Sequence, residues 1–536
     1  MAAFTLIAVW AEHASAAAAD GQVDPAGSPA AVAAIADRAG TVQDVRTLPV
    51  LKPWQPGDPT PVRPTRVMRP APGAAAALGA EPPQSADRAA LQPSALTRRF
   101  VVEGTPFTGP SPPDPTGAVG PNHFVQAVNA SSSSAIAIYD KSGKKVAGPF
   151  RLGSLYPSAS HPCRTDGLGD PVVVFDYQAS RWLLMELISS GNALCLYVSN
   201  NSNPVSGGFK AFTFTPPEFP DYPKLGVAPT QNAYLITVSD SRSRVFALKR
   251  SSLLAGAASV PMVTFKFPLL SGFTFQALTP ATVASASSPP SGTPAYAARH
   301  RDTEVHGGTA PAGRDLIELF ELKPNFSSPS ASTSLRRSIT VPDFNSRLCG
   351  LETFDCVPQP GTTQRLDGIR EVIMQPLQYR RNGSTESLVG GFSVDGNGAD
   401  LAAPYWFELR RSLTGWIYRQ GQRYMPTTTL NRWLPSLGID RQGNIAMGFS
   451  TSSGSGSNYP SALITGRLAG DPLSTLRTAT TVKAGTGSQT ANNRWGDYAA
   501  TTVDPSDNCT FWFTSEYIPA GGRWRTTIGA FKFPGC

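Results

Sequence analysis

The sequence predicts an all-β fold, and three of its features carry that prediction. Short runs of alternating apolar and polar residues are separated by turn clusters, which is the pattern of half-buried strands. Charged residues make up only 16% of the 536-residue chain, while glycine and proline number 49 and 50, as is typical of sheets joined by many loops. A unit at residues 494–533 also recurs upstream. No long amphipathic helical pattern competes with this interpretation.

The recurring unit predicts how the sheets are arranged. Its first turn, Val503-Asp504-Pro505 with Asn508, has counterparts at residues 439–444, 227–232, 175–180 and 119–122, and two weaker units lie near Val283 and Ile373. The tripeptide Asn-Arg-Trp occurs at 431–433 and again at 493–495. Spacings of roughly 50 to 90 residues suit propeller blades with their loops. Because one short sheet cannot bury its apolar face alone, these units predict a seven-bladed β-propeller.

The last unit has only three strands, although a blade usually has four. Residues 99–103 form an isolated β-rich run just before the first unit. We expect this run to pair with the last blade, close the ring and cover an edge that would otherwise invite aggregation.

The strands follow from alternating runs bounded by glycine, proline, asparagine, aspartate and serine. In chain order we expect 124–128 and 134–139; 172–176, 182–188 and 194–199; 224–227, 234–239 and 244–249; 295–299 and 316–322; 388–394 and 405–410; 436–439, 445–450 and 462–467; then 498–503, 510–517 and 524–533.

Three regions are predicted along the chain. Residues 1–19 have an apolar stretch and a small-residue end, as in a signal peptide. Residues 20–98 are rich in alanine and proline and predict a disordered tail or pro-segment. Residues 99–536 form the propeller domain. No later apolar run reaches the roughly 18 residues needed to cross a bilayer, so no transmembrane segment is expected.

The six cysteines predict an oxidising compartment. Strand register places Cys163 near Cys195 and Cys509 near Cys536, and sequential pairing then joins Cys349 to Cys356. No Cys-x-x-Cys zinc pattern occurs. We therefore expect a secreted, extracellular or periplasmic protein.

The net charge of +8 is spread thinly over the chain. Its arginines are scattered, with no run of basic residues interleaved with aromatic ones. This pattern predicts a mildly basic solvated surface and no nucleic-acid partner.

Acids recur five or six residues before most inner strands. In a propeller these positions share one face, at the mouth of the central channel, where loops of several blades converge. The predicted mouth acids are Asp114, Asp170, Asp221, Asp367 and Asp497, and beside them lie Arg494, Trp495, Tyr498, Arg432 and Trp433.

The mouth acids admit three interpretations. Aspartate before proline, glycine or tyrosine commonly caps a turn, and a repeat copies such a cap into every blade. Alternatively, clustered carboxylates hold a polar ligand or Ca²⁺, and aromatic faces beside carboxylates and guanidinium groups suit sugars. In the third interpretation two carboxylates catalyse glycoside hydrolysis, and the candidate pairs are Asp497 with Asp170 or Glu371 with Asp367. No cofactor other than Ca²⁺ is expected.

Two further motifs have simpler interpretations. Residues 395–400 resemble a calcium loop, but the twelfth position is Trp406 instead of the bidentate glutamate, so we expect a hairpin turn. His300 and His306 have no third ligand at a suitable spacing and predict an exposed loop.

Residues 493–498, 509–517 and 438–450 resemble a group of secreted bacterial propeller proteins, often described as sialidase-like, most of which have no assigned activity. The resemblance covers roughly residues 99–536 and implies the propeller fold and secretion. It carries over no catalytic residue, because Ser393-Val394-Asp395 is only a fragment of the Asp box that sialidases repeat.

Together these observations predict a secreted propeller that acts as a binding module. Its expected partner is a polysaccharide or a cell-surface glycan or protein, held at the Asp-lined mouth. The alternatives are a glycan-cleaving enzyme that uses two mouth carboxylates, and a structural surface protein without a ligand. Binding is favoured over catalysis, because acids at a propeller mouth do not by themselves make an active site.

Overall fold

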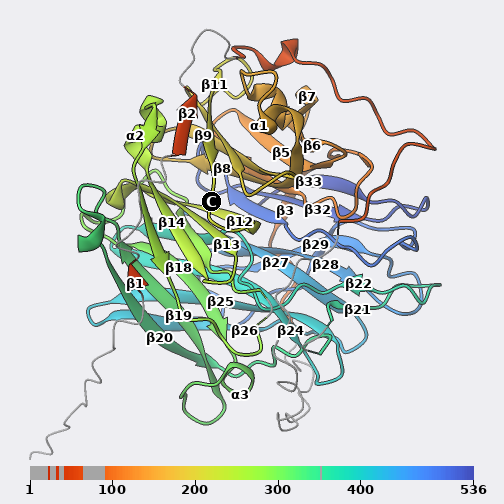
Figure 1. The fold of residues 1–536 in the computed structure, drawn as a ribbon. Helices are drawn as coiled ribbons and strands as arrows, with labels where there is room; N and C mark the ends of the chain where they lie inside the picture. The colour runs from red at the N-terminus through yellow and green to blue at the C-terminus, as the bar shows by residue number, and fades with distance from the viewer. Residues whose placement is uncertain (1–21, 24–31, 36–41, 64–90, 274, 351–352) are drawn as a thin grey trace, which may run out of the picture.

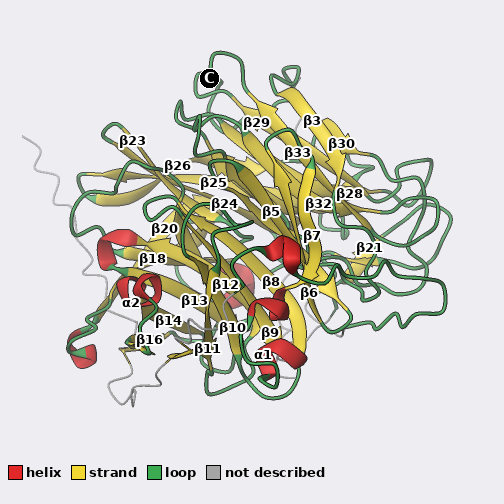
Figure 2. Ribbon diagram, turned by 90° about the horizontal axis from the view of Figure 1, so that it is seen from above, coloured by secondary structure: helices red, strands yellow, loops and turns green. Residues whose placement is uncertain are grey.

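The computed structural model describes residues 22–23, 32–35, 42–63, 91–273, 275–350 and 353–536 of the chain. The fold is all-β, and three of the sheets among the described residues have four strands, while larger sheets have five, six and eight (Figure 1). The short helices α1 (Pro162–Thr165), α2 (Arg250–Ala255) and α3 (Thr303–His306) lie among the connecting loops (Figure 2). In the part of the chain that is described, no helix is long and apolar enough to span a membrane.

Most sheets are built from consecutive antiparallel strands, as the alternating pattern predicts. The first three contain β4 (Thr116–Val119), β5 (His123–Ala130), β6 (Ser133–Asp140) and β7 (Lys145–Arg151); β8 (Gly167–Asp176), β9 (Arg181–Ile188), β10 (Leu194–Ser199) and β11 (Phe209–Phe214); and β12 (Asp221–Ala228), β13 (Ala233–Ser239), β14 (Arg244–Lys249) and β16 (Met262–Lys266).

The following sheets repeat this order. They contain β17 (Thr279–Val283), β18 (Ala295–Arg301), β19 (Arg314–Lys323) and β20 (Thr333–Pro342); β23 (Leu377–Asn382), β24 (Thr385–Asp395), β25 (Ala402–Ser412) and β26 (Gly415–Arg423); and β27 (Asn431–Ile439), β28 (Ile445–Ser452), β29 (Ser461–Arg467) and β30 (Thr480–Lys483). A parallel pairing of β17 with β23 joins two of them. A short ladder of β21 (Asp355–Val357) and β22 (Leu366–Asp367) lies in a loop.

The C-terminal sheet is completed from the other end of the domain. It contains β31 (Ala500–Val503), β32 (Phe511–Tyr517) and β33 (Arg525–Lys532), and β3 (Thr97–Glu103) pairs antiparallel with β33. The predicted pairing of residues 99–103 with the last sheet is therefore confirmed.

The first strands of the sheets contact one another in a closed circuit. In chain order β4 meets β8, β8 meets β12, β12 meets β17, β17 meets β23, β23 meets β27 and β27 meets β31, and β31 returns to β4. Five of these strands (β4, β8, β17, β23 and β31) line a cavity of only about 30 Å³, with Thr116, Val174, Thr282, Gln378 and Thr502 among its lining residues. Little open space therefore lies between these five strands.

Apolar side chains pack between consecutive sheets. One core cluster joins β8–β10 to β12–β14, and another joins β24 and β25 to β27 and β28. The last cluster packs Phe124 and Tyr139 of the first sheet against Trp512 and Ile528 of the C-terminal sheet. Each sheet thus buries both of its faces against its neighbours, which a single sheet could not do.

Parts of the predicted disordered tail are ordered against the sheets. β1 (Gln22–Val23) pairs with β16, and β2 (Val32–Ile35) lies between β11 and β15 (Ser259–Val260). Residues 42–63 begin with the 3₁₀ turn η2 (Val45–Thr47) and run across the domain. These segments of the predicted tail contact the sheets, and the division of the chain at residues 19 and 98 stays a prediction. The predicted signal peptide, residues 1–19, lies outside the described residues.

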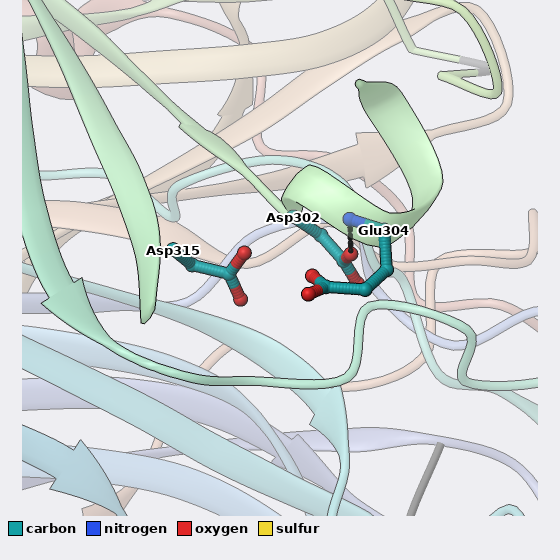
Figure 3. Close-up of side chains that lie close together, drawn as sticks. All are labelled: Asp302, Glu304 and Asp315. Carbon is teal, nitrogen blue, oxygen red and sulfur yellow. Dashed lines mark hydrogen bonds between the residues drawn. The ribbon is translucent and has the colours of Figure 1, made fainter. Parts of the chain in front are cut away.

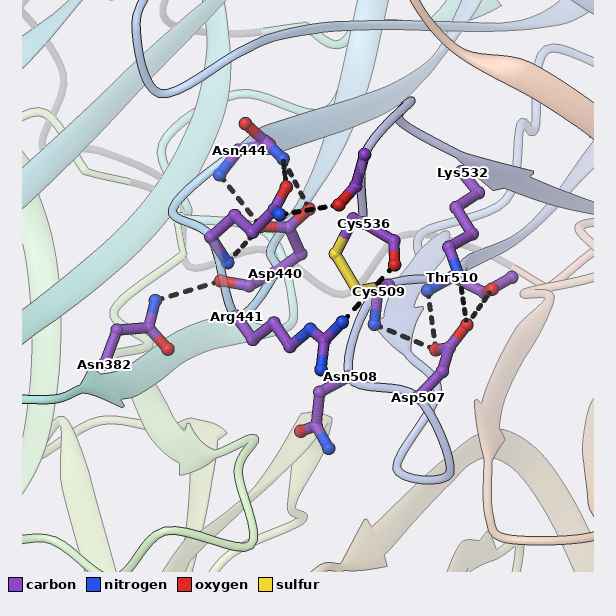
Figure 4. Close-up of a disulfide and its surroundings, with 12 residues drawn as sticks. Asn382, Asp440, Arg441, Asn444, Asp507, Asn508, Cys509, Thr510, Lys532 and Cys536 are labelled. Carbon is purple, nitrogen blue, oxygen red and sulfur yellow. Dashed lines mark hydrogen bonds and ion pairs between the residues drawn. A yellow bond between two sulfur atoms is a disulfide. The ribbon is translucent and has the colours of Figure 1, made fainter.

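The predicted disulfide pairing is confirmed. Cys163 is bonded to Cys195, Cys349 to Cys356, and Cys509 to Cys536. The last of these ties the C-terminus to the turn before β32, where the Asp507 carboxylate accepts hydrogen bonds from the backbone N–H groups of Cys509 and Thr510 (Figure 4).

Candidate functional site

Three of the predicted mouth acids converge although they come from the first, second and last sheets. The Asp497 backbone N–H donates to Asp114 Oδ1 at 2.8 Å. Asn129 Nδ2 donates to Asp114 Oδ2 at 2.6 Å, and Asn129 Oδ1 accepts from the Asp170 N–H at 2.9 Å. One asparagine of β5 therefore holds the two aspartates in place. We call Asp114, Asp170, Asp221, Asp367 and Asp497 the acid cluster.

Arg494 joins the cluster to the loop ladder. Its guanidinium pairs with Asp367 on β22 and donates to both carboxylate oxygens of Asp497 at 3.0 and 2.9 Å. All three side chains are buried. A planar guanidinium can serve two carboxylates at once, which a lysine ammonium does less well.

A repeated backbone feature positions these acids. Asp114, Asp170, Tyr222 and Leu434 each have a positive φ, between 48° and 56°, and each precedes a proline. The strand register shifts at the same places in β8, β12 and β27, as expected for β-bulges. Strained backbone of this kind persists only when its surroundings over-determine it, and it concentrates at functional sites. The recurrent residue-proline pair was the sequence signal for the bulges.

Tyr222 and Tyr498 pack against each other beside the acid cluster. The Tyr222 hydroxyl donates to the Asp497 carbonyl at 2.8 Å, and the Tyr498 hydroxyl donates to the Pro223 carbonyl at 3.1 Å. Their ring centroids lie 5.1 Å apart. Asp221 precedes Tyr222 at the start of β12 and is half-buried.

The predicted indoles do not present a surface. Trp495 and Trp433 pack against each other with ring centroids 5.3 Å apart, and both are completely buried. Arg432 lies apart from the acids and donates to the carbonyls of Thr427 and Leu430. The prediction that these three residues present a stacking face beside the mouth acids is therefore wrong, because all three side chains are buried.

Three residues of the site were not predicted. Lys224 of β12 is fully buried, its Nζ lies 3.3 Å from the centroid of the Tyr222 ring, and it has no hydrogen-bond partner among the described residues. Glu516 of β32 accepts the Gly496 N–H, while its Oε2 is likewise unpartnered. Arg63 enters from the N-terminal segment. A charged residue inside an apolar strand was the available signal for Lys224 and Glu516.

Burial dominates the electrostatics of the cluster. It raises the pKa of Asp170 to about 7, with further repulsion from Asp221 and Asp497. Burial and then the Asp497 and Asp170 charges raise the pKa of Asp114, and burial raises that of Asp367 to about 6 against the attraction of Arg494. The pKa of Lys224 is lowered, again chiefly by burial. Such opposed shifts are typical of sites where protons are exchanged or ions are held.

Asp170 is expected to make folding stability depend on pH. Its pKa of about 7 lies above the ordinary value of 3.8. The folded chain therefore retains a proton that the unfolded chain releases, and the free energy of unfolding falls as pH rises from about 4 to 7. Asp170→Asn cannot ionise, so denaturation from pH 4 to 8 should show the variant gaining stability relative to the wild type over that interval. Parallel profiles would contradict the assignment.

A second acidic group lies away from the mouth. Ligand oxygens of Asp302, Glu304 and Asp315 are within 4.8 Å of one another (Figure 3). Asp302 Oδ1 caps α3 by accepting the Glu304 and Val305 N–H groups, and Asp315 accepts the N–H groups of Thr303 and Phe344. Two of the three carboxylates are therefore already used in fixing turns.

Two minor predictions have clear outcomes. Residues 395–400 form the hairpin turn between β24 and β25, with Asp395 Oδ1 accepting the Asn397 and Gly398 N–H groups. The exposed loop predicted for His300 and His306 is wrong. His300 lies on β18 and is buried, stacked on Phe392 with centroids 4.2 Å apart. Burial lowers its pKa to about 3, so the imidazole is neutral.

Comparisons with known proteins give limited information. No family model and no curated protein matches the chain. Among solved structures, it is similar to an engineered GH43 glycoside hydrolase (11% identity, 83% of this chain and 97% of the other, TM-score 0.27). It is also similar to an exo-β-1,3-galactanase from Clostridium thermocellum (10%, 80% and 87%, 0.30) and to the WD40 domain of SCAP from fission yeast (9%, 76% and 82%, 0.33). Such low TM-scores support no conclusion about activity, and the sialidase-like resemblance stays a prediction.

Proposed function

We propose that the chain is a secreted seven-bladed β-propeller that binds a polar ligand, a glycan, at the acid cluster. The closed circuit of first strands and the pairing of β3 with β33 support the ring. The three disulfides support an oxidising, extracellular location.

Unpartnered polar atoms around the acid cluster carry the ligand proposal. Lys224 Nζ and Glu516 Oε2 are buried without a hydrogen-bond partner among the described residues. Because buried polar groups are usually satisfied, these two atoms beside one cluster of carboxylates support a polar ligand there. Sugar hydroxyls both donate to carboxylates and accept from ammonium or guanidinium groups. Because Trp433 and Trp495 are buried, recognition proceeds by hydrogen bonds and not by stacking on these rings.

The proposal predicts glycan binding that depends on Asp170. The full chain and its Arg63→Ala variant are tested on a broad glycan and polysaccharide array, with calcium and then with EDTA. Asp170→Asn should lower binding at least tenfold, because a carboxylate acceptor at the site is replaced by an amide. The matched control is Asp58→Asn, an exposed aspartate of the N-terminal segment, which should leave binding unchanged.

The outcomes of the array separate the three interpretations of the mouth. Binding lost in EDTA means that a cation mediates recognition. A blank array for both proteins in both buffers rejects the glycan ligand and leaves the structural interpretation, in which the acids cap turns. Asp114 and Glu516 each accept a backbone N–H, as that interpretation requires.

Glycan cleavage is a second candidate, favoured by the raised pKa values of Asp114 and Asp170. A carboxyl group that keeps its proton near neutral pH is suited to general acid catalysis. Release of reducing ends from a bound polysaccharide, with a rate that falls above pH 7 and is lost in Asp170→Asn, is expected for an enzyme. Binding without such release identifies a binding module.

A further inference from the structure

The N-terminal segment places an arginine at the acid cluster. Arg63 precedes the nearest cluster residue, Asp114, by about fifty positions, yet its guanidinium lies against Gly169, next to Asp170. Residues 42–63 cross the domain to reach this point. The contact therefore joins the part of the chain before the propeller to the predicted mouth.

The backbone around Arg63 is held as an extended peptide. Val62 forms a parallel bridge with Ser111, the Arg63 N–H donates to the Ser111 carbonyl at 2.8 Å, and the Ser111 N–H donates to the Pro61 carbonyl at 2.9 Å. Arg494 Nε donates to the Arg63 carbonyl at 2.9 Å. Main-chain pairing with an exposed edge is a general mode of peptide recognition, in which side-chain pockets add specificity.

The guanidinium lies in a space bounded by Gly169 and the Ala130 carbonyl, which we call the cradle. Arg63 Nη2 donates to the Ala130 carbonyl at 2.9 Å. A Cβ atom on Gly169 would lie only 1.8 Å from Arg63 Nη1, so the absence of a side chain at Gly169 makes the space. Burial lowers the pKa of the Arg63 guanidinium, the carboxyl groups of Asp170, Asp114 and Glu186 favour its charged form, and the Arg494 charge opposes it.

The segment leading to Arg63 is attached at separate points. The Leu51 N–H donates to the Pro149 carbonyl at 2.7 Å, and Trp54 packs edge-on against Phe107 with centroids 5.2 Å apart. Between the segment and the domain is a cavity of about 620 Å³, lined by residues such as Leu51, Asp58, Ser131 and Arg164. Residues between Pro49 and Pro59 border this space, whereas Val45 at the start of the segment is buried in a core cluster with side chains of the first two sheets.

We propose that the acid cluster is a binding site for an arginine side chain carried on an extended peptide, and that residues 61–63 occupy this site in cis. The inference rests on the proposed function in one respect, that the cluster is a ligand site. It adds the class of ligand that fits the cradle, and it adds that residues 61–63 compete with this ligand for the site. An external peptide that carries an arginine gains access by displacing Arg63.

The test uses the full chain and a hexapeptide with the sequence of residues 60–65, Thr-Pro-Val-Arg-Pro-Thr. Arg63→Ala vacates the cradle, so the labelled peptide should bind this variant at least tenfold more tightly than the wild type in a fluorescence polarisation assay. A peptide with alanine in place of arginine should not bind. The double variant Arg63→Ala, Asp170→Asn should lose the binding, because it removes a carboxylate that attracts the guanidinium.

Arg46→Ala is the matched control, since Arg46 lies in the same segment and pairs only with the neighbouring Asp44 among the described residues. It should bind the peptide no better than the wild type. Hydrogen exchange of the wild type tests the same proposal if Arg63→Ala does not fold. Excess hexapeptide should speed hydrogen exchange at the Arg63 amide, whereas the alanine peptide should not.

The two proposals fail separately. If Arg63→Ala binds the arginine peptide as weakly as it binds the alanine peptide, the proposed arginine site is wrong. Unchanged exchange at the Arg63 amide in the wild type overturns it as well. If glycans nevertheless bind the wild type and Arg63→Ala equally, glycan binding at the acid cluster stands, but Arg63 does not block the site. Peptide binding with a blank glycan array supports the arginine site and rejects the glycan.

Discussion

Replacing Trp512 by alanine is expected to lower the free energy of unfolding by about 3–5 kcal/mol, the usual cost of truncating a buried aromatic residue. Trp512 is almost fully buried on β32, where β3 and the first sheet meet the C-terminal sheet. Its ring stacks on Phe124 of the first sheet at 5.2 Å and contacts Phe100 of β3 edge-on at 5.1 Å. The substitution therefore opens a cavity between the first sheet, the last sheet and the closing strand at once. Chemical denaturation followed by circular dichroism measures the change.

Trp512→Phe is the informative companion variant. It retains an aromatic ring between Phe124 and Phe100 but loses the hydrogen bond from Trp512 Nε1 to Asp504 Oδ2, which is 3.1 Å long. We expect a loss of about 1–2 kcal/mol, in keeping with an acceptor left short of one donor. A change of less than about 1 kcal/mol for Trp512→Ala would mean that β3 and the first sheet do not depend on this contact.

Replacing Arg494 by alanine is expected to cost about 3–5 kcal/mol, because it leaves two buried carboxylates without their partner. Asp367 and Asp497 both pair with this guanidinium, and Arg494 also holds the Arg63 carbonyl. The loss should be greater at pH 8 than at pH 5, since protonation relieves the uncompensated charge of Asp367, whose pKa is about 6 even with Arg494 present. Denaturation at the two pH values tests this.

The control for Arg494→Ala is Arg525→Ala, at the exposed first residue of β33. Surface substitutions of this kind usually change stability by less than about 0.5 kcal/mol. The loss of stability for Arg494→Lys should lie between those of Arg494→Ala and Arg525→Ala, because a lysine ammonium cannot form paired hydrogen bonds with both carboxylates. Equal stability of Arg494→Ala and Arg525→Ala would show that the buried acids are neutral and need no cation.

Local patterns were enough to predict most of the fold. The alternating run at residues 510–517 and the turn after Val503 led directly to β32 and its hairpin, because strand formation and turn chemistry depend on neighbouring residues. The missing fourth strand of the last unit led to β3, and strand register led to the Cys509–Cys536 bond. The repetition of the unit predicted that the sheets pack next to one another, since each sheet needs neighbours on both faces to bury its apolar side chains.

The site was predicted only in part. Periodicity placed Asp114, Asp170 and Asp497 at equivalent positions of their units, and these acids do converge. The same periodicity also selected Trp433 and Trp495, because the sequence does not distinguish an aromatic residue at a channel mouth from one in the adjacent core. His300 was misplaced for a similar reason, as its strand passes through an aromatic cluster formed by other sheets.

The all-β class, the repeating sheets, the pairing of β3 and the disulfides could be predicted from the chain, since each depends on local pattern or on register within one hairpin. The approach of Arg63 to the acid cluster, the burial of Lys224 and the link from Asp367 to Asp497 through Arg494 became visible only in the folded molecule. These contacts join residues that are far apart along the chain. Their formation depends on how whole sheets pack around the ring, which no local spacing encodes.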